Sequence, residues 1–253
     1  AMLEVRAGDW SIRVPFRAMR RAAAAVLEEG ESAEADYSVT VSPGGDADAR
    51  RLNGWLKEKG MTLAGGPAVF AVSNEEQYDG LHEFRHFPKE VPAAGAQLAA
   101  VRYDPVTRSF AVLPVKKLDG GNEYRIRSFY PGQFAVAALA PKTFEDLDGH
   151  WAKDGIERIA VLGVLNGMGN GKFEPDQPVT RAQFTAMLVR ALGLRLPLAP
   201  APVFPDVAPG DWFAPAVQAA AAAGLVNGDD KGRFRPNDVV TREQMAAMIA
   251  RAM

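Results

Sequence analysis

Residues 144–193 read FEDLDGHWAKDGIERIAVLGVLNGMGNGKFEPDQPVTRAQFTAMLVRALG, and residues 204–253 read FPDVAPGDWFAPAVQAAAAAGLVNGDDKGRFRPNDVVTREQMAAMIARAM. The second stretch repeats the first at an offset of 60 residues, which becomes 61 beyond a one-residue insertion. A fixed period of this size is typical of an architecture that stacks one small folding unit. Identical residues at matching positions include Phe144 and Phe204, Trp151 and Trp212, Gly163 and Gly224, Phe173 and Phe234, and the pairs Thr180-Arg181 and Thr241-Arg242.

Each repeat is predicted to form two helices joined by a glycine-rich loop. Apolar residues recur at helical spacing up to Gly163 and Gly224, where glycine supplies the left-handed residue that ends many helices. The second helix begins at Thr180 in the first repeat and at Thr241 in the second. Its expected apolar stripe consists of Phe184, Met187, Leu188, Ala191 and Leu192 in the first repeat, and of Met245, Met248, Ile249, Ala252 and Met253 in the second.

The first half of the chain has short segments rich in β-branched and aromatic residues, which predict strands. Asp104–Arg108 has the composition of a hairpin turn, whereas Phe16–Glu29 and Ala47–Gly60 have helical composition. The expected strands are Leu3–Arg6, Trp10–Val14, Tyr37–Val41, Val69–Val72, Leu98–Tyr103, Phe110–Val115, Tyr124–Phe129 and Phe134–Ala137.

These patterns predict an α+β multidomain protein. Residues 1–141 are expected to form a β-sandwich-like spacer or display domain with one or two helices. The two all-α repeats follow at residues 142–195 and 203–253, and the proline-rich residues 196–202 form a semi-stiff linker between them.

Composition excludes several classes of function. The 253 residues contain 29 Lys+Arg and 31 Asp+Glu, so a general affinity for nucleic acid or an anionic membrane surface is not expected. The absence of cysteine excludes disulfides, thiolate catalysis and cysteine-ligated metals. No apolar stretch is long enough to span a membrane. No secretory signal opens the sequence, and we expect the natural chain to start elsewhere, because Ala1-Met2 resembles a cloning remnant.

Two of the three histidines, His82 and His86, are four residues apart, which is a zinc-binding spacing on a helix. The surrounding segment LHEFRHF alternates in the manner of a strand instead, and no third ligand is apparent. We therefore expect a surface strand with two exposed imidazoles, and neither a metal nor another cofactor.

The start of the second helix carries the same polar pattern in both repeats. Thr180 and Gln183, and again Thr241 and Gln244, have the spacing of a capping box. In such a box the threonine hydroxyl accepts from the amide three residues on, and the glutamine returns to the amide of the capping residue. These four residues are expected to cap the two helices.

The arginines that follow the threonines are unusual, because the helix dipole disfavours a cation in the first turn. Arg181 and Arg242 beside free helix-start amides would concentrate positive potential that suits a carboxylate or a phosphate. The alternative is a local salt bridge, for example between Arg181 and Asp176. The sequence leaves these alternatives open.

The glycine-rich loops and the tryptophans also allow two interpretations. Gly167 and Gly228 lie in loops that are either simple turns or surfaces that a sugar can approach closely. Trp151 and Trp212 precede the first helix of each repeat, where they either fill the core or line a sugar groove. No catalytic constellation emerges, since there is no Gly-x-Ser-x-Gly and no histidine with a partner nucleophile.

The repeated pattern Phe-x-Asp-(Leu/Val), Trp, Gly-x-x-Asn-Gly, Phe-x-Pro, Thr-Arg-x-x-(Phe/Met) resembles the S-layer homology domain along both copies. Such domains attach bacterial surface proteins non-covalently to secondary cell-wall polysaccharides, often ones that carry pyruvate ketals. The resemblance implies a secreted protein of the cell wall or S-layer, with ligand binding at the Thr-Arg-Ala-Glu motif. The candidate polysaccharide-binding residues are Arg181, Arg242, Trp151, Trp212, Gly167, Gly228, Asp176 and Asn237.

The sequence departs from the family pattern in two ways. Gln183 and Gln244 replace the glutamate of the motif, which keeps the cap but removes a negative charge. Family members usually pack three tandem repeats, and this sequence has two. We expect the third repeat either to lie outside this chain or to come from other chains.

The leading hypothesis is an anchoring fragment in which the repeats bind secondary cell-wall polysaccharide and peptidoglycan, without enzymatic activity. One alternative is the accessory end of an extracellular polysaccharide-degrading enzyme whose catalytic domain is absent; another is a self-assembling lattice protein. Two repeats leave apolar flanks that a third would cover, so association of chains through the repeats is also expected.

Overall fold

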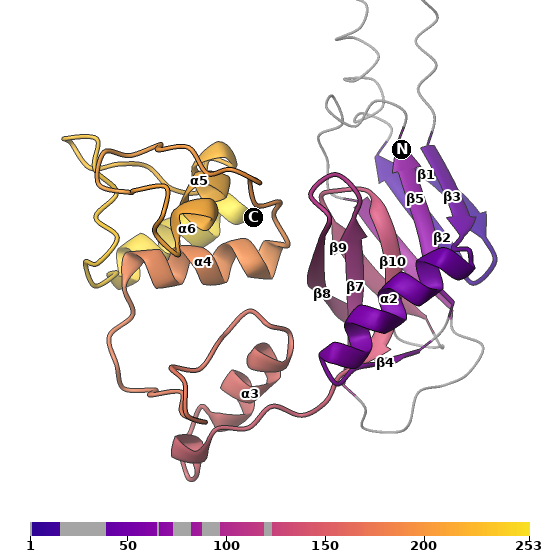
Figure 1. The fold of residues 1–253 in the computed structure, drawn as a ribbon, viewed down its shortest axis with the longest axis horizontal. Coiled ribbons are helices and arrows are strands. Elements are labelled where there is room, and N and C mark those ends of the chain that lie inside the picture. Colours follow the sequence, from indigo (N-terminus) through magenta and orange to yellow (C-terminus); the bar gives the residue numbers. More distant parts are fainter. Residues whose placement is uncertain (1, 16–38, 65, 73–81, 88–96, 119–122) are drawn as a thin grey trace, which may run out of the picture. The chain divides into compact units, whose positions relative to one another are not determined.

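The computed structural model describes residues 2–15, 39–64, 66–72, 82–87, 97–118 and 123–253. The chain divides into two compact units, Ala1–Ala140 (unit 1) and Pro141–Met253 (unit 2), and each unit is described by itself (Figure 1). The helix expected at Phe16–Glu29 lies outside the described residues.

The described strands of unit 1 form one ten-stranded antiparallel sheet (Figure 1). Its order is β1-β2-β6-β9-β8-β7-β10-β5-β3, and β4 pairs with β10. The expected hairpin at Asp104–Arg108 is confirmed, because it joins β7 to β8. The strands are β1 (Met2–Ala7), β2 (Trp10–Pro15), β3 (Val39–Pro43), β4 (Thr62–Leu63), β5 (Ala68–Val72), β6 (His82–His86), β7 (Leu98–Asp104), β8 (Ser109–Lys117), β9 (Tyr124–Ser128) and β10 (Gly132–Ala138).

The long strand β8 explains why this sheet resembles a sandwich without being two separate sheets. Its residues up to Pro114 pair with β7, whereas Val115 and the residues after it pair with β9. Strands that change partners in this way form the corners of folded sheets. The two ends of the strand order, β1 and β3, come into contact, so the sheet curls back on itself.

Helix α2 (Asp46–Glu58) confirms the helix expected at Ala47–Gly60 and covers one face of the sheet. Its buried Leu52 and Leu56 pack on Val101 of β7 and on Ala135 of β10. A second, larger cluster includes Ile12, Phe70, Phe84 and Phe134 from four different strands. Unit 1 therefore has its own core.

The expectation of exposed histidines in unit 1 is wrong. The strand itself is confirmed, but His82 and His86 are fully buried, because they share the inward face of β6 with Phe84. Glu83 and Arg85 occupy the opposite, partly exposed face and form an ion pair with each other. His86 packs against Trp10 with ring centroids 4.3 Å apart, so its imidazole fills the core.

The described residues of unit 2 contain four α-helices, one short 3-10 helix and two isolated β-bridges. Gly163 and Gly224 follow the first helix of each repeat with φ of 71° and 68°, as a left-handed end requires. In both second helices the threonine and glutamine of the capping box exchange their hydrogen bonds. The elements are η1 (Glu145–Leu147), α3 (Lys153–Val161), α4 (Arg181–Leu192), α5 (Ala214–Ala222) and α6 (Arg242–Ala252).

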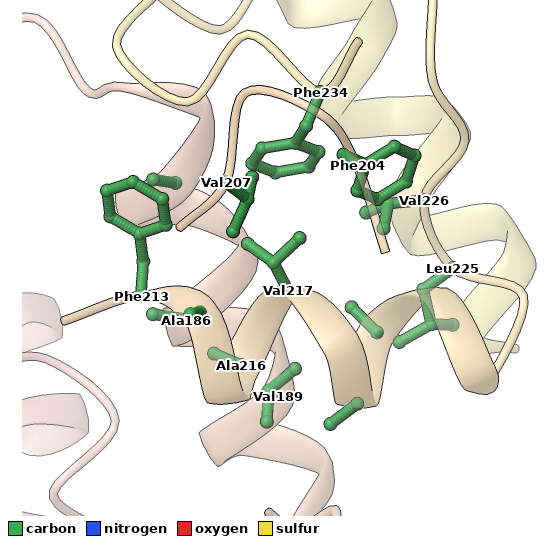
Figure 2. Packing of buried hydrophobic residues seen from close by; sticks show 14 of the residues in the cluster. Ala186, Val189, Phe204, Val207, Phe213, Ala216, Val217, Leu225, Val226 and Phe234 are labelled. Carbon is green, nitrogen blue, oxygen red and sulfur yellow. The ribbon is translucent and has the colours of Figure 1, made fainter. Parts of the chain in front are cut away.

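The main core of unit 2 lies between the repeats, because α4 of the first repeat packs on α5 of the second and also contacts α6. The stripe expected on α4 is therefore rotated: its buried residues are Ala182, Thr185, Ala186 and Val189. These small residues meet the alanine-rich α5, while Leu188 and its neighbours pack at the edge of the cluster. Figure 2 shows α5 residues Ala216 and Val217 among residues of both repeats in this core.

The first half of repeat 1 has a separate, smaller cluster. Phe144, Leu147 and Ala160 are buried there, and Ile156 and Phe173 pack against them. The first half of repeat 1 therefore closes on its own loop, whereas its second helix, α4, reaches across to repeat 2.

Candidate functional site

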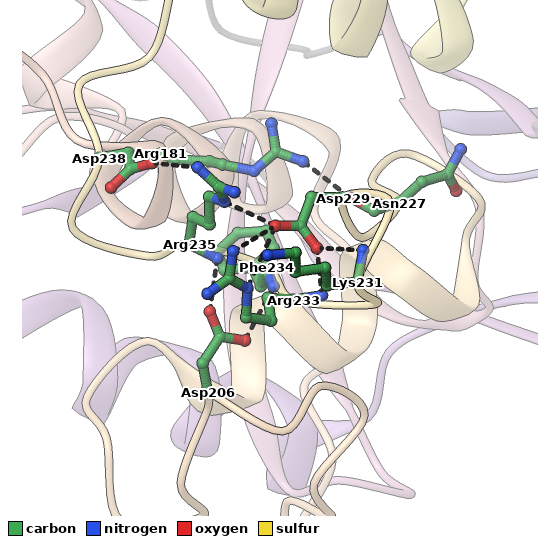
Figure 3. Close-up of polar contacts among 9 residues, drawn as sticks. All are labelled: Arg181, Asp206, Asn227, Asp229, Lys231, Arg233, Phe234, Arg235 and Asp238. Atoms are coloured by element: carbon green, nitrogen blue, oxygen red, sulfur yellow. Dashed lines mark hydrogen bonds and ion pairs between the residues drawn. The ribbon is translucent and has the colours of Figure 1, made fainter.

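A groove of about 270 Å³ lies where the start of α4 meets the loop of the second repeat. Arg181 enters it from α4, and Gln244 and Arg251 line it from α6. Its loop side is formed by Asn227, Gly228, Asp229, Arg233, Phe234, Arg235 and Asp238. The lining contains four arginines and two aspartates, a formal charge of +2. Figure 3 shows most of these charged side chains converging on the loop.

The loop is fixed at its far end by the aspartate of the Phe-x-Asp motif. The amides of Phe234 and Arg235 donate to the Asp206 carboxylate at 2.8 and 2.7 Å. Arg235 has a left-handed φ of 59°, which is strained for a residue with a side chain. Asp146 holds Phe173 and Glu174 in the same way in repeat 1, where Glu174 also has a φ of 59°. This aspartate is therefore the structural support of the loop in both repeats.

Asp229 organises the inside of the loop in the second repeat. Its Oδ1 accepts from the amides of Lys231 and Arg233 at 2.9 and 2.8 Å, and its Oδ2 accepts from the side chains of Arg233 and Arg235 (Figure 3). These bonds, led by the one from the Arg233 amide, hold the pKa of Asp229 well below its usual range. Two of the groove's arginines, Arg233 and Arg235, therefore share one carboxylate partner.

The start of α4 is bonded to the second repeat through its backbone. The amides of Arg181 and Ala182 donate to the carbonyl oxygens of Asp238 and Pro236 at 2.9 and 3.0 Å, and Val240 returns a bond to Val179. The expected free amides beside Arg181 are therefore absent, because the next repeat occupies them. Any anion site here depends on side chains.

The Arg181 guanidinium is partly buried in the groove without a carboxylate partner among the described residues. Its Nη2 donates to the carbonyl oxygen of Asn227 at 2.8 Å, and its Cζ lies over the ring of Phe234, 5.0 Å from the ring centre (Figure 3). Its Nε is buried and has no hydrogen-bond acceptor in the described part of the chain. Burial, and then the charge of Arg251, lower the pKa of Arg181, against the opposing influence of Asp238.

The proposed salt bridge between Arg181 and Asp176 does not form among the described residues. Asp176 instead lines a separate open hollow in repeat 1 with Asp146, Asp148 and Glu174. Its counterpart in repeat 2, Asn237, is exposed beside the groove and does not line it.

Of the two loop glycines, Gly228 lines the groove. A side chain there would approach the Gly232 backbone to 2.9 Å, so the loop can close only over glycine. At Gly167 a side chain would meet the Phe144 ring at 2.6 Å and the Lys172 carbonyl oxygen at 2.5 Å. Both glycines therefore have a steric role in closing their loops.

The core alternative is wrong for both tryptophans. Trp151 is 92% exposed and Trp212 is 62% exposed, and neither lines the groove of Arg181. Arg242 begins α6 as Arg181 begins α4, but its side chain is exposed. The structure thus brings together Arg181, Gly228 and Gln244 from the expected set.

Sequence reasoning missed Asp206, Asp229, Arg233, Arg235 and Arg251. The recurrence of Phe-x-Asp at an offset of 60 residues could have identified the first as a structural position. Asp229 carried no such signal, because its counterpart in repeat 1 is Met168. Within the described residues, no group of three or more His, Asp or Glu could hold a metal ion, and no helix is long and apolar enough to cross a membrane.

Comparison with known families matches the model of the S-layer homology domain to residues 143–185 and 203–246. The two repeats are S-layer homology domains. Each match spans the Phe-x-Asp motif, the glycine-rich loop and the start of the second helix, and the groove residues Ala247, Met248 and Arg251 lie beyond the matches.

Relatives include both enzymes and surface-layer proteins. An amylopullulanase of Thermoanaerobacterium thermosulfurigenes is 38% identical over 62% of this chain and 8% of its own length. An endo-1,4-beta-xylanase A of Thermoanaerobacterium saccharolyticum is 46% identical over 41% of this chain and 9% of its own length. The S-layer protein sap of Bacillus anthracis is 34% identical over 48% of this chain and 15% of its own length.

The chain therefore spans only a small part of these relatives, and their enzyme names assign no catalytic domain to it. S-layer homology domains, which these surface proteins and enzymes share, imply cell-wall anchoring at the outside of the cell.

Proposed function

We propose that unit 2 binds a secondary cell-wall polysaccharide, and that it recognises a carboxylate of a pyruvylated sugar in the groove at Arg181. The observation that carries this proposal is the partly buried Arg181 guanidinium, which has no carboxylate partner among the described residues. Burying a guanidinium that has only one carbonyl acceptor costs free energy, and an anion that accepts its remaining hydrogen bonds would offset that cost.

The rest of the groove supports a sugar acid in preference to a free inorganic anion. Phe234, Ala247 and Met248 provide apolar surface in the lining, and the C–H face of a sugar ring packs well on such surface. The lining has a formal charge of +2, which favours an anionic ligand. The ligand class that fits both features is a carbohydrate with a carboxylate.

Unit 1 is proposed to act as a spacer or display domain beside the anchoring unit. It has its own core and forms a compact unit. The match to the amylopullulanase is longer than unit 2, so it must include part of unit 1. This observation favours one second candidate, in which the chain is the accessory end of a polysaccharide-degrading enzyme.

A pull-down with purified sacculi tests the anchoring proposal. Sacculi of Bacillus thuringiensis and Brevibacillus brevis, two species with matching surface proteins, are used with and without their secondary polymer. We expect the chain to bind the intact sacculi and to lose binding after the polymer is stripped. Equal binding to stripped sacculi would contradict the proposal.

The carboxylate requirement needs a defined competitor. A methyl hexopyranoside with a 4,6-pyruvate ketal is expected to displace the chain from sacculi. The matched 4,6-ethylidene glycoside lacks only the carboxylate, and it is expected to fail. Displacement by both compounds would contradict recognition of the acid. Hydrolysis of pullulan or xylan by this chain would show that it has an activity of its own.

A further inference from the structure

A second guanidinium lines the groove beside Arg181. Arg251, in the last turn of α6, donates through Nη1 to the carbonyl oxygen of Leu225 at 3.2 Å, and its side chain is otherwise exposed. Among the described residues, no carboxylate pairs with it. The other two arginines of the lining, Arg233 and Arg235, are bound to Asp229.

The two unpaired guanidiniums are held close together by the chain. Arg181 donates to the carbonyl of Asn227, and Arg251 donates to the carbonyl of Leu225, only two residues earlier. Two residues span at most about 7 Å, so the acceptors hold both cations over one short segment. Their mutual repulsion is opposed within the groove by Asp238, which also faces Arg235 at 3.7 Å.

The first repeat supplies a natural comparison for Arg251. Arg190 occupies the equivalent position on α4, and its Nη1 donates to the carbonyl oxygen of Val164 at 3.4 Å. The bond between the second helix and the end of the first is thus a structural feature of each repeat. Of the two arginines, Arg251 alone lines the groove, so the same helix-end bond places a guanidinium beside Arg181 only in the second repeat.

We propose that Arg251 is a second ligand-binding residue and that Arg181 and Arg251 hold one sugar carboxylate between them. The carboxylate would accept hydrogen bonds from both guanidiniums and supply the acceptor that the Arg181 Nε lacks. This inference rests on the proposed function, because it names a further residue of the same groove. It makes Arg251 a determinant of specificity for acidic over neutral sugars.

The test uses the full chain and the substitution Arg251→Gln, which keeps an amide donor for Leu225. Arg190→Gln is the matched control, because it alters the equivalent helix-end bond outside the groove. Affinity for intact sacculi is measured, together with inhibition by the pyruvate-ketal glycoside. We expect Arg251→Gln to weaken both by about ten- to a hundredfold, and Arg190→Gln to change neither.

The double variant Arg181→Gln/Arg251→Gln tests whether the two residues share one carboxylate. Residues that share a partner give non-additive losses, so we expect the double variant to bind about as weakly as the weaker single variant. Equal affinities of Arg251→Gln and Arg190→Gln would overturn the proposal, and so would multiplying losses in the double variant. Failure of the unaltered chain to bind any intact sacculi would instead overturn the proposed function.

Discussion

Arg181 and Arg242 begin equivalent helices with the same capping box, yet their surroundings differ. At Arg181 the loop of the following repeat closes over the helix start, bonds to its amides and forms a groove. At Arg242 the side chain is exposed, and no equivalent loop covers it within the part of the chain that the structure describes. The groove therefore belongs to a pair of consecutive repeats, and a single Thr-Arg motif supplies only half of it.

The glycine-rich loops of the two repeats also differ in their internal contacts. Asp229 draws Arg233 and Arg235 inward in repeat 2, whereas Met168 takes its position in repeat 1 and is 58% exposed. The loop that meets a preceding helix is thus the one with an internal charge network. Four experiments can test this difference between the repeats.

The largest expected effect is the loss of stability of unit 1 in acid. Burial lowers the pKa of His82 and of His86 to about 4, from an ordinary 6.5. The unfolded chain therefore takes up protons first, so unit 1 loses stability as the pH falls from 6.5 to 4, by up to about 3 kcal/mol per imidazole. Tryptophan fluorescence of Trp10, beside His86, is expected to report this transition.

The variant His86→Phe separates the imidazoles from the other titrating groups. It is expected to flatten the acid limb of the unfolding curve, because one protonation site is lost. An unchanged acid limb would contradict the burial argument. Binding to sacculi through Arg181 should survive at a pH where unit 1 has unfolded, since the network of Asp229 stays ionised there.

Local sequence was sufficient to predict the parts of unit 2 that depend on neighbouring residues. The helix starts at Thr180 and Thr241 and the helix ends at Gly163 and Gly224 follow from caps and backbone conformation. The buried face of α4 could not be predicted in this way. It is decided by α5, a helix of the next repeat with a different, alanine-rich surface.

In the candidate site, too, only residues with a local sequence signal could be predicted. Arg181 stood out because a cation is disfavoured at a helix start, and Gly228 because a glycine-rich loop would let a sugar approach the backbone closely. Arg251 carries no local signal, since an arginine near the end of a helix is ordinary. His82 and His86 were assigned to the wrong face because alternation gives the period of a strand but not which side meets the core.

The second experiment compares the aspartates that support the two loops. Asp206→Ala leaves the amides of Phe234 and Arg235 without their acceptor, and we expect a loss of about 2–4 kcal/mol in the stability of that loop. Hydrogen exchange at these amides measures it, and polymer binding should fall with it. Asp146→Ala is expected to speed hydrogen exchange in the loop of repeat 1 and to leave polymer binding intact. Equal loss of binding in both variants would show that the groove needs both loops.

The third experiment compares the two arginines directly. Arg181→Gln is expected to weaken binding to sacculi by about ten- to a hundredfold, because it removes a charge that is shielded from water. Arg242→Gln should weaken binding by less than about threefold, because an exposed charge contributes little. Both variants keep their capping boxes, so thermal unfolding should be nearly unchanged. Equal losses at the two positions would indicate that another chain completes a second groove at Arg242.

The last and smallest expected effect concerns the apolar face of α6. Leu188 and Leu192 of α4 pack against the core between the repeats, but their counterparts Ile249 and Met253 are 45% and 100% exposed. Exposed apolar surface that an equivalent helix buries is a site for association, and a second copy of the chain carries the repeats that could cover it. Ile249→Lys would remove roughly 1–1.5 kcal/mol of burial, so we expect light scattering to show about a tenfold weaker self-association.

Val106→Lys is the matched control for that substitution, because Val106 is 56% exposed on a hairpin of unit 1, outside the repeats. Val106→Lys should leave the self-association of the full chain unchanged. Residues 141–253 alone, with and without Ile249→Lys, give a second comparison. A monomer at every concentration would contradict association through the repeats. Equal effects of the two lysines would locate the contact elsewhere. If Ile249→Lys alone weakens association, α6 requires the same kind of neighbour that α4 has, and Arg181 and Arg242 differ because only α4 has a further repeat packed against it within this chain.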